Sequence, residues 1–213
     1  MAKHIITIAR MYGSGGRLLA KTLSKELGIH YYDKELLQLV SLEHGVNMSI
    51  VSDADEKYDE GFFKKYVSRE IASPSSREYL SKSNIFNMTA DVIRSIADKD
   101  ESCVILGRCA NQVLKGRDDV ISVFLHADYE HLVNFAMGYD GISAAEAMQK
   151  IESVNRERAA YHKYYTDRDW LDSRNYDLCL NTGKLSIEEC VRVVQDYMAV
   201  LDSRETNGKE ETR

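Results

Sequence analysis

The chain is poor in proline and in paired cysteines, which argues against several classes of protein. Pro74 is the single proline in 213 residues, so the sequence has no proline-rich linker or recognition segment. The cysteines show no C-x-x-C spacing, which argues against a zinc ribbon, a redox motif or a disulfide framework. We therefore expect small buried thiols in a reducing compartment at all four positions, Cys103, Cys109, Cys179 and Cys190.

Long apolar runs and an excess of basic charge are also missing. No run approaches the roughly 20 apolar residues that a membrane span needs, and the N-terminus lacks the apolar core of a signal peptide. We therefore expect a cytoplasmic protein with no membrane partner. The net charge of −6 argues against a nucleic-acid partner, because such binders need a basic face. The composition, 44% hydrophobic and 29% charged, is typical of a globular domain and leaves the oligomeric state open.

The most informative segment, residues 5–20, joins a β-branched apolar run to a glycine-rich turn and then to a helical pattern. Strand, glycine loop and helix in this order are typical of a phosphate-binding loop. Glycines let backbone N–H groups converge on an anion, and the helix adds its own unpaired N–H groups and the positive end of its dipole. The segment therefore predicts a nucleotide-phosphate site, with a turn that binds nothing as the alternative.

The loop departs from the usual P-loop pattern, G-x-x-x-x-G-K-[ST]. Gly16 stands where the lysine is expected, and Arg17 stands where the Mg²⁺-binding Ser or Thr is expected. A guanidinium pairs bidentately with phosphate oxygens, so Arg17 is a candidate substitute for the lysine. Mg²⁺ then needs another anchor, for which Ser14 is the candidate. The residues expected to bind the phosphates of ATP are Gly13, Ser14, Gly15, Gly16 and Arg17.

Apolar runs alternate with helical patterns along the chain. The runs cover residues 5–8, 29–32, 103–106, 120–125 and 177–180. Continuous apolar runs are typical of strands buried on both faces of a parallel sheet. The predicted fold class is therefore α/β: a three-layer α/β/α sandwich of the P-loop NTPase type with about five parallel strands. Since ligands bind at the carboxyl ends of such strands, the glycine loop, Asp33 and Arg108 are expected to lie together.

Three helix starts are predicted from possible capping boxes. The Ser52-x-x-Asp55 pattern predicts a helix that begins there, with the acidic residues of segment 53–60 on its solvated first turn and metal binding as the alternative. Ser143-x-x-Glu146 predicts a helix through about Tyr161. Ser186-x-x-Glu189 predicts a last helix that ends near Leu201, and the polar residues 203–213 are expected to be disordered.

Four motifs, in order, resemble the cytidylate-kinase-like family, a branch of the P-loop nucleoside monophosphate kinases. They cover residues 9–17, 31–35, 104–110 and 164–182, within a match that spans about residues 5–197. The resemblance implies a single domain over residues 1–202. Within it we expect a helical segment that binds the acceptor monophosphate, over about 34–98, and a mobile lid over about 140–172.

The resemblance also implies an activity and roles for particular residues. It implies transfer of the γ-phosphoryl group of ATP to CMP or dCMP, with Mg²⁺. Arg108 would bind the phosphate of the acceptor, although Cys109 stands where true cytidylate kinases have an aspartate. Arg156 and Arg158 of the lid would bring charge to the transferring phosphate. Asp33 would bind a sugar hydroxyl or, through water, Mg²⁺; a plain helix cap is its alternative role.

Two other functions stay open at this point. The missing lysine and hydroxyl at Gly16 and Leu18 suggest a non-catalytic nucleotide-binding protein as one alternative. A kinase for another small metabolite is the other, because a fold does not determine its substrate. All three hypotheses share small-molecule partners, and each of them includes a nucleotide.

Overall fold

The computed structural model describes residues 2–55 and 82–210, with backbone alone for residues 82–83 and 205–210. Five strands form one all-parallel sheet in the order β2-β3-β1-β4-β5. The strands are β1 (Ile5–Arg10), β2 (His30–Tyr32), β3 (Cys103–Leu106), β4 (Val120–His126) and β5 (Leu178–Asn181). Each of the five predicted strands is present, and the predicted α/β fold class is confirmed.

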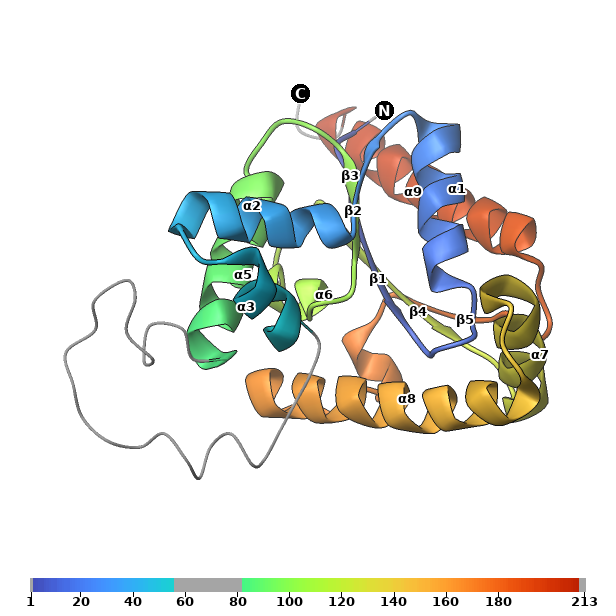
Figure 1. Ribbon diagram of the computed structural model, residues 1–213. Helices are drawn as coiled ribbons and strands as arrows, with labels where there is room; N and C mark the ends of the chain where they lie inside the picture. The colour runs from blue at the N-terminus through green and yellow to red at the C-terminus, as the bar shows by residue number, and fades with distance from the viewer. Residues whose placement is uncertain (1, 56–81, 211–213) are drawn as a thin grey trace.

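Helices cover both faces of the sheet, which makes three layers (Figure 1). One face carries α1 (Gly16–Leu27) and α9 (Ile187–Glu210). The other carries α2 (Lys34–His44), α3 (Met48–Ala54), α5 (Lys82–Ala97) and the short α6 (Ala110–Val113). The helix α7 (Tyr129–Asp140) leads into the long α8 (Ala144–Thr166), which crosses below the sheet at the bottom of Figure 1.

The alternation of side chains along the central strands builds the two cores. Ile5 belongs to the core under α2 and α5, whereas Ile6 and Ile8 belong to the core under α1 and α9. Successive side chains of a strand point to opposite faces, so a run without polar interruptions fills both layers. Both cores hold residues that are fully buried, which is why the apolar runs predicted these strands correctly.

Several helix boundaries differ from the predicted ones. Helix α3 begins after Asn47, whose side chain accepts a hydrogen bond from the Ser49 N–H, and Asp55 caps its other end. The predicted helix start at Ser52 is therefore wrong, because a better cap lies five residues earlier. The Ser143 capping box is confirmed, and α8 continues to Thr166. The last helix continues to Glu210 rather than ending near Leu201.

Three of the four cysteines are buried as expected, but Cys179 is exposed. It lies on β5, the edge strand at one end of the sheet that the described residues form. None of the helices among residues 2–55 and 82–210 is long and apolar enough to cross a membrane.

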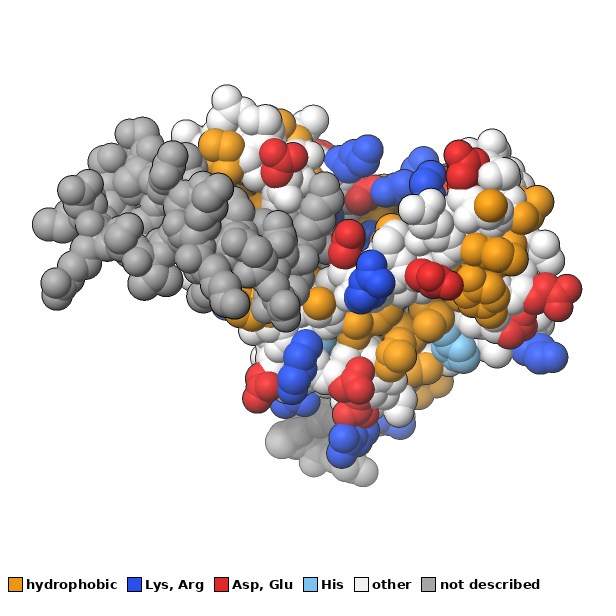
Figure 2. All heavy atoms as spheres, turned by 60° about the horizontal axis from the view of Figure 1, so that its bottom comes forward, with side chains coloured by type: hydrophobic (Ala, Val, Ile, Leu, Met, Phe, Trp, Pro, Cys, Tyr) orange, Lys and Arg blue, Asp and Glu red, His pale blue; other side chains and the backbone are white. Residues whose placement is uncertain are grey.

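The face that carries α8 mixes charged and apolar side chains (Figure 2). Lys and Arg side chains are interspersed with Asp and Glu over much of it, and hydrophobic side chains gather near its centre and toward the right-hand end of the view. The exposed apolar side chains of α7 and α8 are Tyr129, Met137, Tyr139, Met148 and Tyr164.

An ion-pair cluster at the start of β4 gives a testable pH dependence. Arg117 donates to both carboxylate oxygens of Asp119 at 2.9 Å, and Lys3 Nζ lies 3.1 Å from Asp119 Oδ2. The hydrogen bonds from Arg117, opposed by burial and assisted by Lys3, lower the pKa of Asp119 to about 2. A lowered pKa in the folded state stabilises the fold above the ordinary pKa of an aspartate, and this stabilisation is lost as the pH falls toward 2.

We therefore expect Asp119→Asn to lower the free energy of unfolding by about 1 kcal/mol at neutral pH, the full pKa shift being discounted for partial exposure. The difference from the wild type should shrink as the pH falls from about 4 to about 2. Urea unfolding across this pH range measures it, with Asp118→Asn at the exposed neighbouring position as the control. Equal stability of Asp119→Asn and the wild type at pH 7 would contradict the assignment.

Candidate active site

The glycine loop connects β1 to α1 at the carboxyl end of the central strand. Gly13 and Gly15 have φ values of 81° and 77°, in the left-handed region where glycine is strongly favoured. A Cβ at Gly13 would collide with the backbone carbonyl of Leu132 on α7, and one at Gly15 would lie 2.7 Å from Ile187 Cδ1 on α9. The loop is therefore seated between two helices. Gly13 is required by conformation and by space, because the backbone of Leu132 cannot turn aside, whereas Gly15 is required by its conformation, because Ile187 Cδ1 is the far end of a side chain that can move.

Hydrogen bonds inside the loop orient Ser14 away from the cleft. The Ser14 N–H and its hydroxyl both donate to the Met11 carbonyl, at 3.3 and 2.8 Å, and the residue is fully buried. The hydroxyl suggested as the Mg²⁺ anchor is thus directed into the loop in this conformation. Its position in the sequence, beside the glycines, does not reveal where the hydroxyl points.

Helix α8 is bonded directly to the loop. The Tyr12 N–H donates to Asn155 Oδ1 at 2.7 Å, and Arg158 Nη1 donates to the Arg10 carbonyl at 3.0 Å. The Tyr12 hydroxyl donates to Asp140 Oδ2 at 2.5 Å, and burial together with this carboxylate raises the pKa of Tyr12. These contacts place the segment expected to be a lid against the phosphate-binding loop.

A cleft of about 240 Å³ opens over the loop. Its lining includes four of the five residues expected to bind phosphate, namely Gly13, Gly15, Gly16 and Arg17. Arg10 and Arg158 line it as well, so three guanidinium groups border the same space. The rings of Phe135 and Tyr139 from α7 form an apolar wall, and Tyr139 is 45% exposed at the rim.

Arg17 and Arg108 are connected through Asp33, which follows β2. Arg17 Nε donates to Asp33 Oδ2 at 2.9 Å, and Arg108 Nη1 lies 3.9 Å from Asp33 Oδ1. Burial lowers the pKa of Arg17 and the Asp33 carboxylate raises it, with a net rise. The structure therefore brings together all three of these predicted residues at the carboxyl edge of the sheet. Asp33 is also the residue that precedes α2, but its side chain makes no capping hydrogen bond there.

Arg108 is held by a second carboxylate, that of Asp55, which the sequence analysis placed at a helix start. Its Nη2 donates a hydrogen bond to Asp55 Oδ2 at 2.9 Å, and its Nε makes an ion-pair contact with Asp55 Oδ1 at 2.9 Å. Arg108 is only 3% exposed. Asp55 thus closes the end of α3 against Arg108, and it was wrong to treat this acid as part of a solvated helix start.

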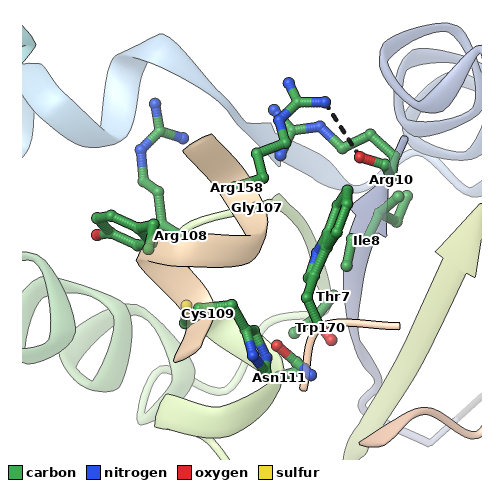
Figure 3. Close-up of a pocket in the computed structure, with 12 residues that line it drawn as sticks. Thr7, Ile8, Arg10, Gly107, Arg108, Cys109, Asn111, Arg158 and Trp170 are labelled. Atoms are coloured by element: carbon green, nitrogen blue, oxygen red, sulfur yellow. Dashed lines mark hydrogen bonds between the residues drawn. The ribbon is translucent and has the colours of Figure 1, made fainter. Parts of the chain in front are cut away.

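A small cavity lies beneath Arg108 (Figure 3). Arg10, Arg108 and Arg158 line it; in the close-up Arg108 and Arg158 point upward, and Arg10 runs across toward Arg158. Its free volume of about 20 Å³ is enough for a single water molecule. His162 of α8 also lines it, and burial lowers the pKa of this imidazole, which favours its neutral form. Arg10 and Arg158 border both the cleft and this cavity, so the two spaces adjoin.

The two lid arginines differ in position. Arg158 borders both spaces, whereas Arg156 is exposed on α8 and lines neither of them. The far half of α8 contacts the helical segment, because the Tyr165 ring stacks on Phe86 of α5 with centroids 4.1 Å apart. Helix α8 therefore spans from the phosphate loop to α5. No group of three or more potential metal ligands is found among the residues that the structure describes.

The parallel sheet, the glycine loop at the end of its central strand and the converging arginines define a kinase-like protein of the P-loop class. The model of the cytidylate kinase-like family matches residues 5–184, and the chain belongs to this family. Membership agrees with the resemblance in the four motifs, and it identifies the chain as a phosphotransferase of the nucleoside monophosphate kinase type.

Individual relatives match over nearly the whole chain. The cytidylate kinase of Pyrococcus horikoshii is 28% identical over 94% of this chain and 91% of its own length. That of Thermococcus kodakarensis is 26% identical over 97% of this chain and 94% of its own. A crystal structure of an uncharacterized protein from Eubacterium ventriosum has a TM-score of 0.68 at 27% identity, covering 92% of this chain and 99% of that one. Shikimate kinase from Bacteroides thetaiotaomicron, at 14% identity, a TM-score of 0.52 and coverage of 92% and 98%, shares the fold alone.

Proposed function

We propose that the protein transfers the γ-phosphoryl group of ATP to a nucleoside monophosphate, with CMP or dCMP as the preferred acceptor. The observation that carries the proposal is the junction of the two spaces at Arg10 and Arg158. Phosphoryl transfer requires the attacking and leaving oxygens in line, with cations that neutralise charge on the transferring group, and it needs little covalent chemistry from the protein. The preference for a cytidine nucleotide is supported by the relatives that carry the name cytidylate kinase.

Donor binding is assigned to the cleft over the loop. The backbone N–H groups of Gly13, Gly15, Gly16 and Arg17 would hold the β-phosphate, and the Ser14 N–H would have to leave the Met11 carbonyl to join them. The Arg17 side chain would reach the β and γ oxygens. Arg158 would contact the transferring phosphate, with Arg156 joining it if α8 moves on binding. A lid that closes over the phosphates also excludes water and so limits hydrolysis of ATP.

Acceptor binding is assigned to Arg108 and Asp33. Arg108 would bind the phosphate of the monophosphate with the guanidinium edge that now holds Asp55. Asp33 would accept a hydrogen bond from a sugar hydroxyl. An acceptor phosphate is already ionised near neutral pH, so the reaction does not require a general base.

The residues around the cleft fit Mg²⁺ in part. Asp33 and Asp140 are carboxylates near the cleft, and both already accept hydrogen bonds from protein groups. Mg²⁺ commonly keeps several waters and is held by one or two carboxylates together with substrate phosphates. Holding the ion through water is therefore the alternative role of Asp33 to its contact with a sugar hydroxyl, and the ion would neutralise charge on the β and γ oxygens of ATP.

Transfer of label from γ-labelled ATP to a panel of nucleoside monophosphates tests the proposal. We expect labelled CDP or dCDP in greatest yield, and we expect Arg17→Ala to lower the rate at least about tenfold, since it removes a charge-assisted phosphate contact. The control is Arg94→Ala, an exposed arginine on α5 that pairs with Asp91. Label transfer to none of the acceptors, or equal rates for wild type and Arg17→Ala, would contradict the corresponding part of the proposal.

A non-catalytic nucleotide-binding protein is the second candidate. The observation that favours it is that Tyr12 and Ser14 already use their N–H groups within the protein, while Arg17 is paired with Asp33. This candidate predicts ATP binding without label transfer to any acceptor. The same panel therefore separates it from the leading proposal.

A further inference from the structure

Arg10 occupies an unusual position in the P-loop pattern. With Gly16 at the lysine position of G-x-x-x-x-G-K-[ST], Arg10 stands where the first glycine is expected. The loop therefore carries two exchanges: glycine has become arginine at residue 10, and lysine has become glycine at residue 16. A cation has been lost from one end of the loop and gained at the other.

The two exchanges are linked by space. A Cβ at Gly16 would lie 2.6 Å from Arg10 Cγ and 2.7 Å from Arg10 Cβ, closer than real Cβ atoms come to other atoms. These atoms belong to the base of the Arg10 side chain, which cannot swing aside without moving the strand end. Gly16 has no positive φ, so space rather than backbone conformation requires the glycine. A lysine at position 16 and an arginine at position 10 therefore exclude each other.

The Arg10 side chain lies where the cleft over the loop adjoins the small cavity. Arg10 is 8% exposed, yet it lines both the cleft and the small cavity. Its carbonyl accepts the hydrogen bond from Arg158, and Figure 3 shows the two side chains reaching into the same part of the site. A guanidinium remains charged in a protein interior, and several cations that converge on one cavity favour an anion there.

Arg17 does not occupy the region that the Arg10 side chain occupies. It stands one position beyond Gly16, its side chain is 44% exposed, and its Nε is paired with Asp33 at 2.9 Å. Arg10, in contrast, passes directly over the first turn of α1, where the stem of a lysine at position 16 would begin.

We propose that Arg10 is a catalytic residue that replaces the P-loop lysine and contacts the β and γ phosphate oxygens of a nucleoside triphosphate. Gly16 leaves room for its side chain. The nature of this ligand rests on the proposed function, while the exchange of position between residues 10 and 16 rests on the geometry. The loop thus has its cation at residue 10, at the end of β1, in place of a lysine at residue 16, at the start of α1.

Exchange variants of the full chain test the proposal through ATP affinity, measured by calorimetry, and through label transfer. Arg10→Met keeps an unbranched stem over Gly16 and removes the charge. We expect it to lower kcat/KM for ATP about 100-fold, as loss of a clamp on transition-state charge does, and to weaken ATP binding. Arg94→Met is the matched control and should match the wild type.

The swap supplies the sharper test. We expect each single variant to have a lower kcat/KM than the wild type. Arg10→Gly lacks the cation, and in Gly16→Lys the lysine collides with Arg10. The double variant Arg10→Gly/Gly16→Lys has the ordinary P-loop pattern, and we expect it to regain at least about tenfold in kcat/KM over Arg10→Gly. Thermal unfolding of each variant identifies any that fail to fold, and Arg10→Met then carries the test.

Each outcome supports or overturns a separate statement. Wild-type ATP affinity and turnover in Arg10→Met would overturn the role of Arg10, and a double variant no better than Arg10→Gly would overturn the exchange. If the wild type binds ATP but transfers label to no monophosphate, the proposed function fails, and weaker ATP binding by Arg10→Met still supports Arg10 as the phosphate contact. If the wild type binds no ATP, both proposals fail.

Discussion

Replacing Gly13 with alanine is expected to lower kcat/KM for ATP about 100-fold or more while leaving the protein folded. The Cβ of alanine would collide with the backbone carbonyl of Leu132, which belongs to α7 and cannot rotate away as a side chain would. The loop must therefore shift from its seat, and a displacement of about 1 Å in a phosphate cradle is enough for a loss of this size. Steady-state label transfer at varied ATP concentration measures the loss.

Gly28→Ala supplies a matched control. Gly28 also has a positive φ, of 65°, but a Cβ there meets nothing within 4 Å. Both variants therefore suffer the left-handed backbone penalty of about 1–2 kcal/mol, and only Gly13→Ala suffers the collision. We expect Gly28→Ala to lose stability in urea unfolding and to keep its kcat/KM. Unchanged kcat/KM in Gly13→Ala would mean that the loop does not bind phosphate in the conformation seen.

The sheet could be predicted from the sequence because buried parallel strands leave a local signal. The runs at 103–106 and 120–125 are apolar on both faces, and this pattern depends on neighbours in the chain alone. The carboxyl ends of the strands then placed Arg17, Asp33 and Arg108 near one another, as the ion pairs show. The parallel arrangement of the strands brings these residues to one edge of the sheet, whichever way their side chains point.

Contacts between distant segments left no such signal. Asp55 pairs with Arg108, which lies 53 residues away, yet it belongs to an acidic cluster that looks like any solvated helix end. Asn155 is one polar residue on a long helix, and its bond to the Tyr12 N–H depends on how α8 crosses the loop. The sequence shows Arg10 at the first glycine position of the P-loop pattern. Only the structure shows why this matters, because a Cβ at Gly16 would collide with the Arg10 side chain.

Replacing Arg108 with methionine is expected to raise KM for the nucleoside monophosphate at least about 30-fold and to leave ATP affinity nearly unchanged. Charge-assisted hydrogen bonds contribute about 1.5–3 kcal/mol each, and a bidentate phosphate contact uses two of them. The ATP cleft lies over the glycine loop and does not include Arg108 in its lining. Acceptor titration in the label-transfer assay measures KM, and calorimetry measures ATP affinity.

The same variant should also lower the free energy of unfolding by about 2–3 kcal/mol, because it leaves the Asp55 carboxylate without the buried guanidinium that pairs with it. Asp55→Asn separates the structural role of the pair from binding. It weakens the pair but keeps Arg108, so we expect lower stability with an acceptor KM no higher than that of the wild type. The double variant Arg108→Met/Asp55→Asn should be more stable than the two separate losses predict, while its acceptor KM stays high. An acceptor KM that follows stability across the three variants would mean that Arg108 serves the fold through Asp55 and does not bind the acceptor.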